Sequence, residues 1–139
     1  MQRPIRLILL LFTVLALSYS TLIPIFEAQD ELFHYAFADH LATTWQLPVQ
    51  PRTLEEPLGL WEQEGGQPPL AYWLAAFLIS PIDRQDFFSR SQHNPFAALG
   101  VARSDEANLN AVLHDPAQEA FPWHGTVLAL HLARLLSIV

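Results

Sequence analysis

The sequence predicts an all-α membrane protein with one N-terminal transmembrane helix, an external loop carrying amphipathic juxtamembrane helices, and the start of a second transmembrane helix. Three observations support this fold class. Hydrophobic residues make up 51% of the 139 residues and charged residues only 15%. The mainly apolar stretch from Leu7 to Phe26 contains no charged residue, and a second apolar run begins at Gly125. This composition is too apolar for an ordinary soluble domain of this size and too polar for a chain that lies wholly in the membrane.

Charge and cysteine content exclude several classes of function. The net charge is -7, and all seven basic residues are arginine. A nucleic-acid partner would require a basic surface, so none is expected. The chain has no cysteine, which excludes disulfides and thiolate metal sites.

Residues 1–26 are predicted to form the first transmembrane helix. About 20 apolar residues are needed for a helix to cross the hydrocarbon core of a bilayer, and Leu7 to Phe26 meets that length. Arg3 and Arg6 precede the run, and acidic residues follow it. By the positive-inside rule, the N-terminus is expected in the cytoplasm and residues 27–124 outside, at the plasma membrane.

A cleaved signal peptide is the alternative for this N-terminal segment. Its hydrophobic region would be Leu7 to Leu17, with the small residues Ser18 and Ser20 before the cleavage site. A retained anchor is favoured because apolar residues resume at Leu22 and continue to Phe26. Under either interpretation the rest of the chain is exported.

An amphipathic helix is predicted over residues 28–44. One face has three- and four-residue spacing and comprises Phe33, Ala36, Phe37, His40 and Leu41. The acidic residues Glu27, Asp30 and Glu31 fall on another face with His34. Asp30 and His34 are four residues apart and are therefore expected to be neighbours.

A second juxtamembrane helix is predicted over residues 69–80. Before it, prolines in Leu47 to Pro51 favour an extended segment, and Glu55 to Gly66 reads as an acidic loop. Pro68 and Pro69 suit the first turn of a helix, which needs no amide hydrogen there. The uncharged stretch Leu70 to Ser80 is too short to span a bilayer, so a position at the membrane interface is expected.

The last third of the chain is polar up to Trp123 and then apolar. A short helix is expected over Asp105 to His114. Residues 125–139 read as the start of a second transmembrane helix that stops at Val139 soon after it has become apolar. This pattern predicts that the chain is the N-terminal part of a longer protein.

Four short motifs occur in an order that resembles a known family. They are Asp30-Glu31 with His34, then Leu47-Pro48-Val49-Gln50, then Gln67-Pro68-Pro69-Leu70-Ala71-Tyr72-Trp73, and finally Ala133-Arg134-Leu135-Leu136-Ser137. Together they resemble the N-terminal part of GT-C type, polyprenyl-phosphate-dependent glycosyltransferases, the group of protein O-mannosyltransferases and aminoarabinose transferases. The resemblance covers nearly the whole chain. One departure is Gln67, where many relatives carry lysine or histidine.

The resemblance implies an inverting transfer of a sugar from a polyprenyl-phosphate donor to an acceptor hydroxyl. It implies Asp30 as the general base and Glu31 as a second catalytic residue, which orients the acceptor or holds a loop. It also implies substrate binding by His34, Gln67 and Arg134. The leaving phosphate needs cationic help, and the sequence does not select among Arg52, Arg84 and Arg134 for that role.

Two alternatives remain open from the sequence. The alternative to a glycosyltransferase is a small, non-enzymatic, membrane-anchored or exported protein that binds a membrane partner. No cofactor is expected; a divalent metal held by His34 with Asp30 or Glu31 is compatible with their spacing but is not indicated. The oligomeric state is not set by any feature of the sequence.

Overall fold

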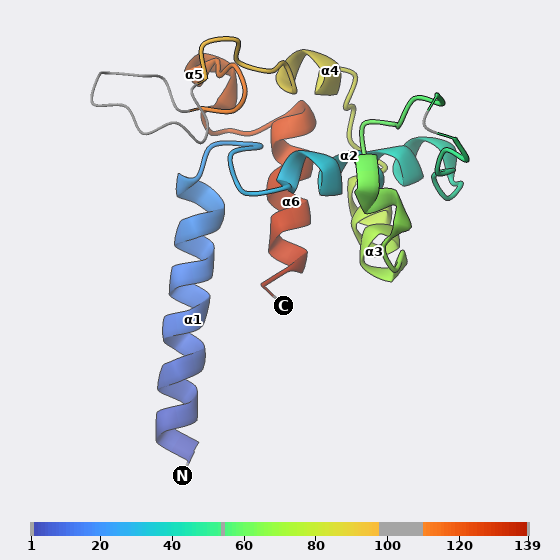
Figure 1. The fold of residues 1–139 in the computed structure, drawn as a ribbon. Helices are drawn as coiled ribbons and strands as arrows, with labels where there is room; N and C mark the ends of the chain where they lie inside the picture. The colour runs from blue at the N-terminus through green and yellow to red at the C-terminus, as the bar shows by residue number, and fades with distance from the viewer. Residues whose placement is uncertain (1, 54, 98–109, 139) are drawn as a thin grey trace.

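The computed structural model describes residues 2–53, 55–97 and 110–138, and 56% of the chain is helical. No strand occurs within these ranges, which confirms the all-α prediction. Figure 1 shows the arrangement of the helices. They are α1 (Gln2–Leu22), α2 (Glu31–Thr44), the 3₁₀ helix η1 (Glu62–Gly66), α3 (Leu70–Ile79), α4 (Phe87–Arg90), α5 (Pro116–Glu119) and α6 (Gly125–Leu136).

Helix α1 extends away from the other helices as a single rod (Figure 1). Its window Pro4–Leu22 has a mean hydropathy of 2.0, and only 6% of the window is buried. Such a helix is long and apolar enough to cross a membrane, and it is not a core helix of the described fold. A secretory signal sequence near an N-terminus shares the same length and composition.

Helix α1 ends at Leu22, four residues before the apolar run does. Pro24 follows the helix and has no amide hydrogen with which to continue it. Ile25 and Phe26 then turn inward and are buried, with Phe26 in the left-handed backbone region at φ 62°. The apolar residues at the end of the run therefore belong to the core beside α2 and not to the first helix.

Helix α2 lies at the centre of the core. It begins at Glu31 and not at Ala28, because Asp30 adopts a left-handed conformation with φ 58°. Its contacts with α3 are the most extensive between any two described elements, and Phe37 of α2 stacks on Tyr72 of α3 with ring centroids 4.0 Å apart. Of the predicted face, Ala36, Phe37 and Leu41 are buried and Phe33 and His40 are half-buried. Burial also includes Tyr35, Ala38 and Ala42, which lie outside that face.

The helices predicted near residues 69–80 and from Gly125 are both present. Helix α3 occupies Leu70–Ile79, directly after Pro69. Helix α6 starts at Gly125, as expected, and runs for 12 residues to Leu136, packed against α3 and α1. At that length α6 is one of the shorter apolar helices, so its role as the start of a second span stays a prediction.

The helix expected over Asp105 to His114 is not found where it can be assessed. Residues 105–109 lie outside the described residues. Val112 instead forms an antiparallel bridge with His93, and the amide of Asn94 donates to the carbonyl of Ala111 at 2.9 Å. The prediction was wrong for residues 110–114, because this segment gains backbone hydrogen bonds from a distant part of the chain.

Candidate functional site

A cavity of about 500 Å³ lies between α2, α3 and α6. Its walls are mainly aliphatic, and three of the five residues predicted as site residues line it: Glu31, His34 and Arg134. Tyr72 also contributes to the lining. The remaining lining residues are Ala28, Gln29, Tyr35, Ala38, Ala71, Leu74, Ala75, Leu130, Ala133, Leu136 and Ser137. The cavity therefore combines an apolar wall with a few polar groups, as sites for small amphipathic molecules do.

Glu31 and Arg134 form a buried, bidentate ion pair, with nitrogen–oxygen distances of 2.6 and 2.7 Å. The side chains are only 13% and 10% exposed. The other carboxylate contact of Glu31 is the backbone amide of Phe26, at 2.9 Å. Because Glu31 belongs to α2 and Arg134 to α6, the pair joins two helices that are 103 residues apart in sequence.

Arg134 also binds the carbonyl oxygens at the end of α1. Its terminal nitrogens donate to Ser20 and Ile23 at 2.8 Å and to Pro24 at 2.9 Å. A cation is favourable there, because the last carbonyls of a helix lack partners within the helix. A guanidinium has five N–H groups, and these three bonds with the two to Glu31 use all of them. Arg134 therefore holds α1, α2 and α6 together.

His34 belongs to a chain of hydrogen bonds that reaches a buried carboxylate. Its Nδ1 lies 2.7 Å from the hydroxyl of Tyr72, which donates to Oε1 of Gln67 at 2.8 Å. The Gln67 amide nitrogen in turn donates to Glu64, which is 4% exposed. Burial and the negative charge of Glu64 raise the pKa of the Tyr72 hydroxyl, which keeps it protonated. The structure thus connects two predicted site residues, His34 and Gln67, through Tyr72.

Asp30 does not line this cavity. It is exposed, precedes α2, and makes no capping hydrogen bond with its side chain. It lines a second cavity of about 450 Å³ together with Glu27 and His93. Ala28 and Gln29 line both cavities, so the two adjoin along this short segment. The groups considered for a metal are therefore separated: Asp30 lies in one cavity, Glu31 pairs with Arg134, and Nδ1 of His34 is bonded to Tyr72.

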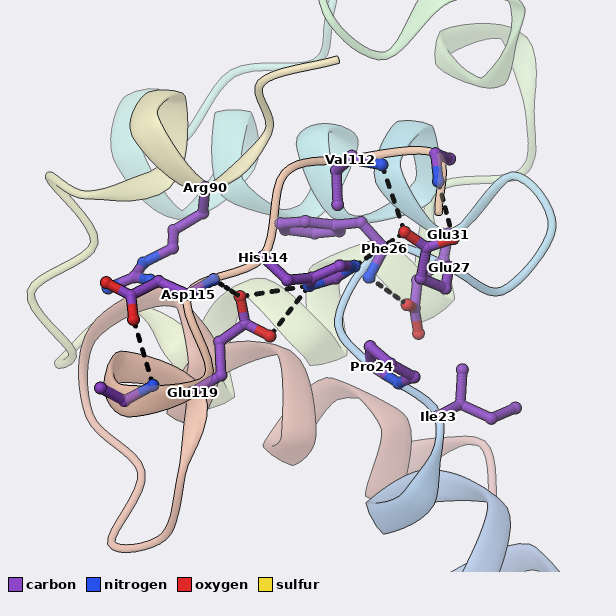
Figure 2. A network of polar contacts seen from close by, with 12 residues as sticks. Ile23, Pro24, Phe26, Glu27, Glu31, Arg90, Val112, His114, Asp115 and Glu119 are labelled. Carbon is purple, nitrogen blue, oxygen red and sulfur yellow. Dashed lines mark hydrogen bonds and ion pairs between the residues drawn. The ribbon is translucent and has the colours of Figure 1, made fainter. Parts of the chain in front are cut away.

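A second polar network, drawn in Figure 2, surrounds Glu27 and His114. Nε2 of His114 lies 2.8 Å from Glu27, and Nδ1 lies 2.9 Å from Glu119. Glu27 also accepts the amides of Ala111 and Val112, at 2.9 and 3.2 Å. This network fastens residues 110–119 to the turn after α1. It was not predicted, because Glu27 and His114 are 87 residues apart and no spacing rule connects them.

The other arginines considered for a leaving phosphate lie elsewhere. Arg84 bonds Asp39 at 2.6 Å and the carbonyl oxygens of Ile79 and Ile82, so it closes the loop after α3 onto α2. Arg52 is exposed in the loop before η1 and lines neither cavity. Arg134 is thus the one arginine among the described residues lining the larger cavity, and its N–H groups are already used.

Some candidate roles were missed at the sequence level. Tyr72 lies in the segment that was expected at the membrane interface, whereas it is 9% exposed and bonded to His34. Glu64 falls within the predicted acidic loop, and the prediction gave no sign that it would be buried. Its burial follows from η1, which folds the loop against α2.

No protein family, curated protein or solved structure matches this chain.

Proposed function

We propose that this chain is the N-terminal part of a GT-C type membrane glycosyltransferase and that the larger cavity holds the polyprenyl-phosphate donor. The observation that supports this most is the cavity itself, which brings Glu31, His34 and Arg134 together beside an aliphatic wall. An isoprenoid chain requires such a wall, and a phosphate requires polar groups at its end. The exposed, apolar α1 would anchor the site in the bilayer.

The proposed reaction follows the family that the motifs resemble. The acceptor hydroxyl attacks C1 of the sugar, and Asp30 takes the hydroxyl proton as the new C1–O bond forms. The bond between C1 and the phosphate oxygen breaks, and the lipid phosphate leaves with the electron pair. The position of Asp30 in an adjoining cavity supports placing the acceptor there and the donor in the larger cavity. Glu31 holds the loop after α1 in place through Arg134 and the amide of Phe26.

Photo-crosslinking tests the donor site. The full chain in nanodiscs would be irradiated with a photoreactive polyprenyl phosphate. Ala71 is exposed and lines the cavity, so Ala71→Trp is expected to obstruct it and to reduce crosslinking several-fold. Leu70→Trp is the matched control, because Leu70 is exposed on the same helix but does not line the cavity. Equal labelling of both variants would contradict the proposal.

The chemistry and the topology have separate tests. In membranes that contain the protein, Asp30→Asn is expected to abolish sugar transfer and to leave lipid crosslinking unchanged; normal turnover would exclude Asp30 as the base.

The proposed topology has a cytoplasmic N-terminus and residues 27–124 outside. A glycosylation acceptor introduced between Glu55 and Gly66 should therefore be modified in an insertion assay, and an unmodified acceptor would reverse the topology.

One observation favours a second candidate, a non-enzymatic, membrane-anchored protein that binds a membrane partner. The arginine that lines the cavity has no N–H left for a leaving phosphate. Lipid crosslinking that depends on the cavity, together with no sugar transfer by the wild-type protein, would support this candidate over the enzyme.

A further inference from the structure

The hydrogen-bond chain at His34 has a defined direction. It ends at Glu64, and an ionised carboxylate can only accept hydrogen bonds. The Gln67 group that faces Glu64 must therefore be the NH₂, which leaves Oε1 of Gln67 to face Tyr72. An amide oxygen only accepts, so the Tyr72 hydroxyl donates to it.

The direction of this chain fixes the tautomer of His34. Since the Tyr72 hydrogen is directed at Gln67, the Tyr72 oxygen must accept from Nδ1 of His34 at 2.7 Å. Nδ1 therefore carries a hydrogen in both the neutral and the charged ring. Protonation changes Nε2 alone, from an acceptor to a donor.

Nε2 of His34 is available to a ligand. In the described part of the chain no hydrogen bond engages it, the side chain is 43% exposed, and His34 lines the larger cavity. The only other cation lining that cavity among the described residues, Arg134, is fully bonded to Glu31 and to the end of α1. A phosphate bound there would thus find one cationic donor, the imidazolium of His34.

We propose that His34 is the phosphate-binding residue of the cavity, that its charged ring donates from Nε2 to the phosphate of an isoprenoid lipid, and that binding strengthens as the pH falls. This inference rests on the proposed function.

Several charged or titratable groups face His34. Glu31 comes from the start of its own helix, Glu64 from η1, Tyr72 from α3 and Arg134 from α6, while Asp30 lies just before the helix and lines the adjoining cavity. The carboxylate of Glu64 lies 3.9 Å from Nδ1, and Glu31 is paired with Arg134.

Lipid binding as a function of pH tests the proposal. The full chain in nanodiscs would be titrated with a polyprenyl-phosphate sugar, a phosphodiester that keeps one negative charge throughout, at about pH 5.5 and about pH 8, between which histidine changes its charge. One charge-assisted hydrogen bond predicts binding about tenfold tighter at the lower pH. His34→Gln retains a donor to Tyr72 but cannot gain charge, so its affinity should vary less than about twofold. His124→Gln, an exposed histidine outside the cavity, is the matched control and should retain the wild-type pH dependence.

Two ligands and one spectroscopic measurement complete the test. Polyprenol without phosphate should bind with no pH dependence, and inorganic phosphate should not compete; competition by inorganic phosphate would overturn the lipid assignment.

Nitrogen NMR of the imidazole should show the Nδ1–H tautomer at high pH, and Tyr72→Phe should abolish that preference. If lipid binds equally well at both pH values and to His34→Gln, the role of His34 is refuted and the proposed function stands. If no lipid binds at either pH, both are refuted.

Discussion

Replacing Glu31 with Gln should strongly destabilise the fold, because it leaves Arg134 buried without its counter-ion. The Arg134 side chain is 10% exposed, and Glu31 accepts two of its hydrogen bonds, at 2.6 and 2.7 Å. Removing one partner of such a pair costs about 3–5 kcal/mol, far more than the 0–1 kcal/mol of an exposed pair. The variant also weakens the bond to the amide of Phe26. A small domain has only about 5–15 kcal/mol in total, so the expected loss is a large fraction of its stability.

Urea unfolding in detergent, followed by tryptophan fluorescence, would measure this loss. Trp123 is a suitable reporter, because its ring stacks on His131 of α6 at 3.6 Å and should lose that contact when α6 detaches. Glu55→Gln makes the same substitution at an exposed loop position and should change the free energy of unfolding by less than about 0.5 kcal/mol. A loss below about 1 kcal/mol for Glu31→Gln would refute the buried-pair reasoning.

Three further predictions follow from other contacts. Asp86→Asn should cost about 1–2 kcal/mol in urea unfolding, because Asp86 accepts from the amide and hydroxyl of Thr126 at 2.9 and 2.7 Å. Burial disfavours the charged form of Asp86, but the hydrogen bonds from Thr126 and Arg90 outweigh this effect and lower the pKa of Asp86. The charged carboxylate therefore stabilises the fold at pH values above the ordinary aspartate pKa. This stabilisation should fade as the pH falls through the lowered pKa in the wild type, and Asp86→Asn should not show that pH dependence. Gly125→Ala should destabilise by about 1 kcal/mol or more, because Gly125 has φ 59° and an added Cβ would lie 2.8 Å from the Asp86 carboxylate; a midpoint equal to that of wild type would contradict this. Glu27→Gln should speed hydrogen exchange of the Ala111 and Val112 amides, which Glu27 accepts, and unchanged exchange there would show that the carboxylate does not fasten this segment.

The helices could be predicted from the sequence where a local signal sets them. Pro69 marks the start of α3, and the change to apolar residues after His124 marks the start of α6. The end of α1 was placed too late, because Ile25 and Phe26 are as apolar as a membrane helix but are buried in the core instead. Hydropathy cannot distinguish these two destinations, since both remove the side chain from water.

The contacts of the site could not be predicted in the same way. Glu31, His34 and Arg134, which come from the first and the last of the four motifs, line one cavity. They gave no indication that Glu31 would pair with Arg134, because partners 103 residues apart depend on how α2 and α6 pack. The sequence also gave no indication that Asp30 and Glu31 would line different cavities. Asp30 alone adopts the left-handed backbone conformation, with φ 58°, and Glu31 begins α2 directly after it.

The distribution of charge in the larger cavity explains why His34 is better suited than an arginine to respond to a ligand. A bidentate pair such as Glu31 with Arg134 is rigid and close to neutral, and breaking it to bind a phosphate would leave a buried carboxylate behind. Glu64 presents the complementary problem, because it is 4% exposed and its bonds come from the neutral amides of Gln63 and Gln67. A buried carboxylate with neutral donors gains from any nearby cation, and the ring of His34 at 3.9 Å is the group placed to supply one. The charged ring of His34 would place a cation beside Glu64 and present Nε2 as a donor toward the cavity.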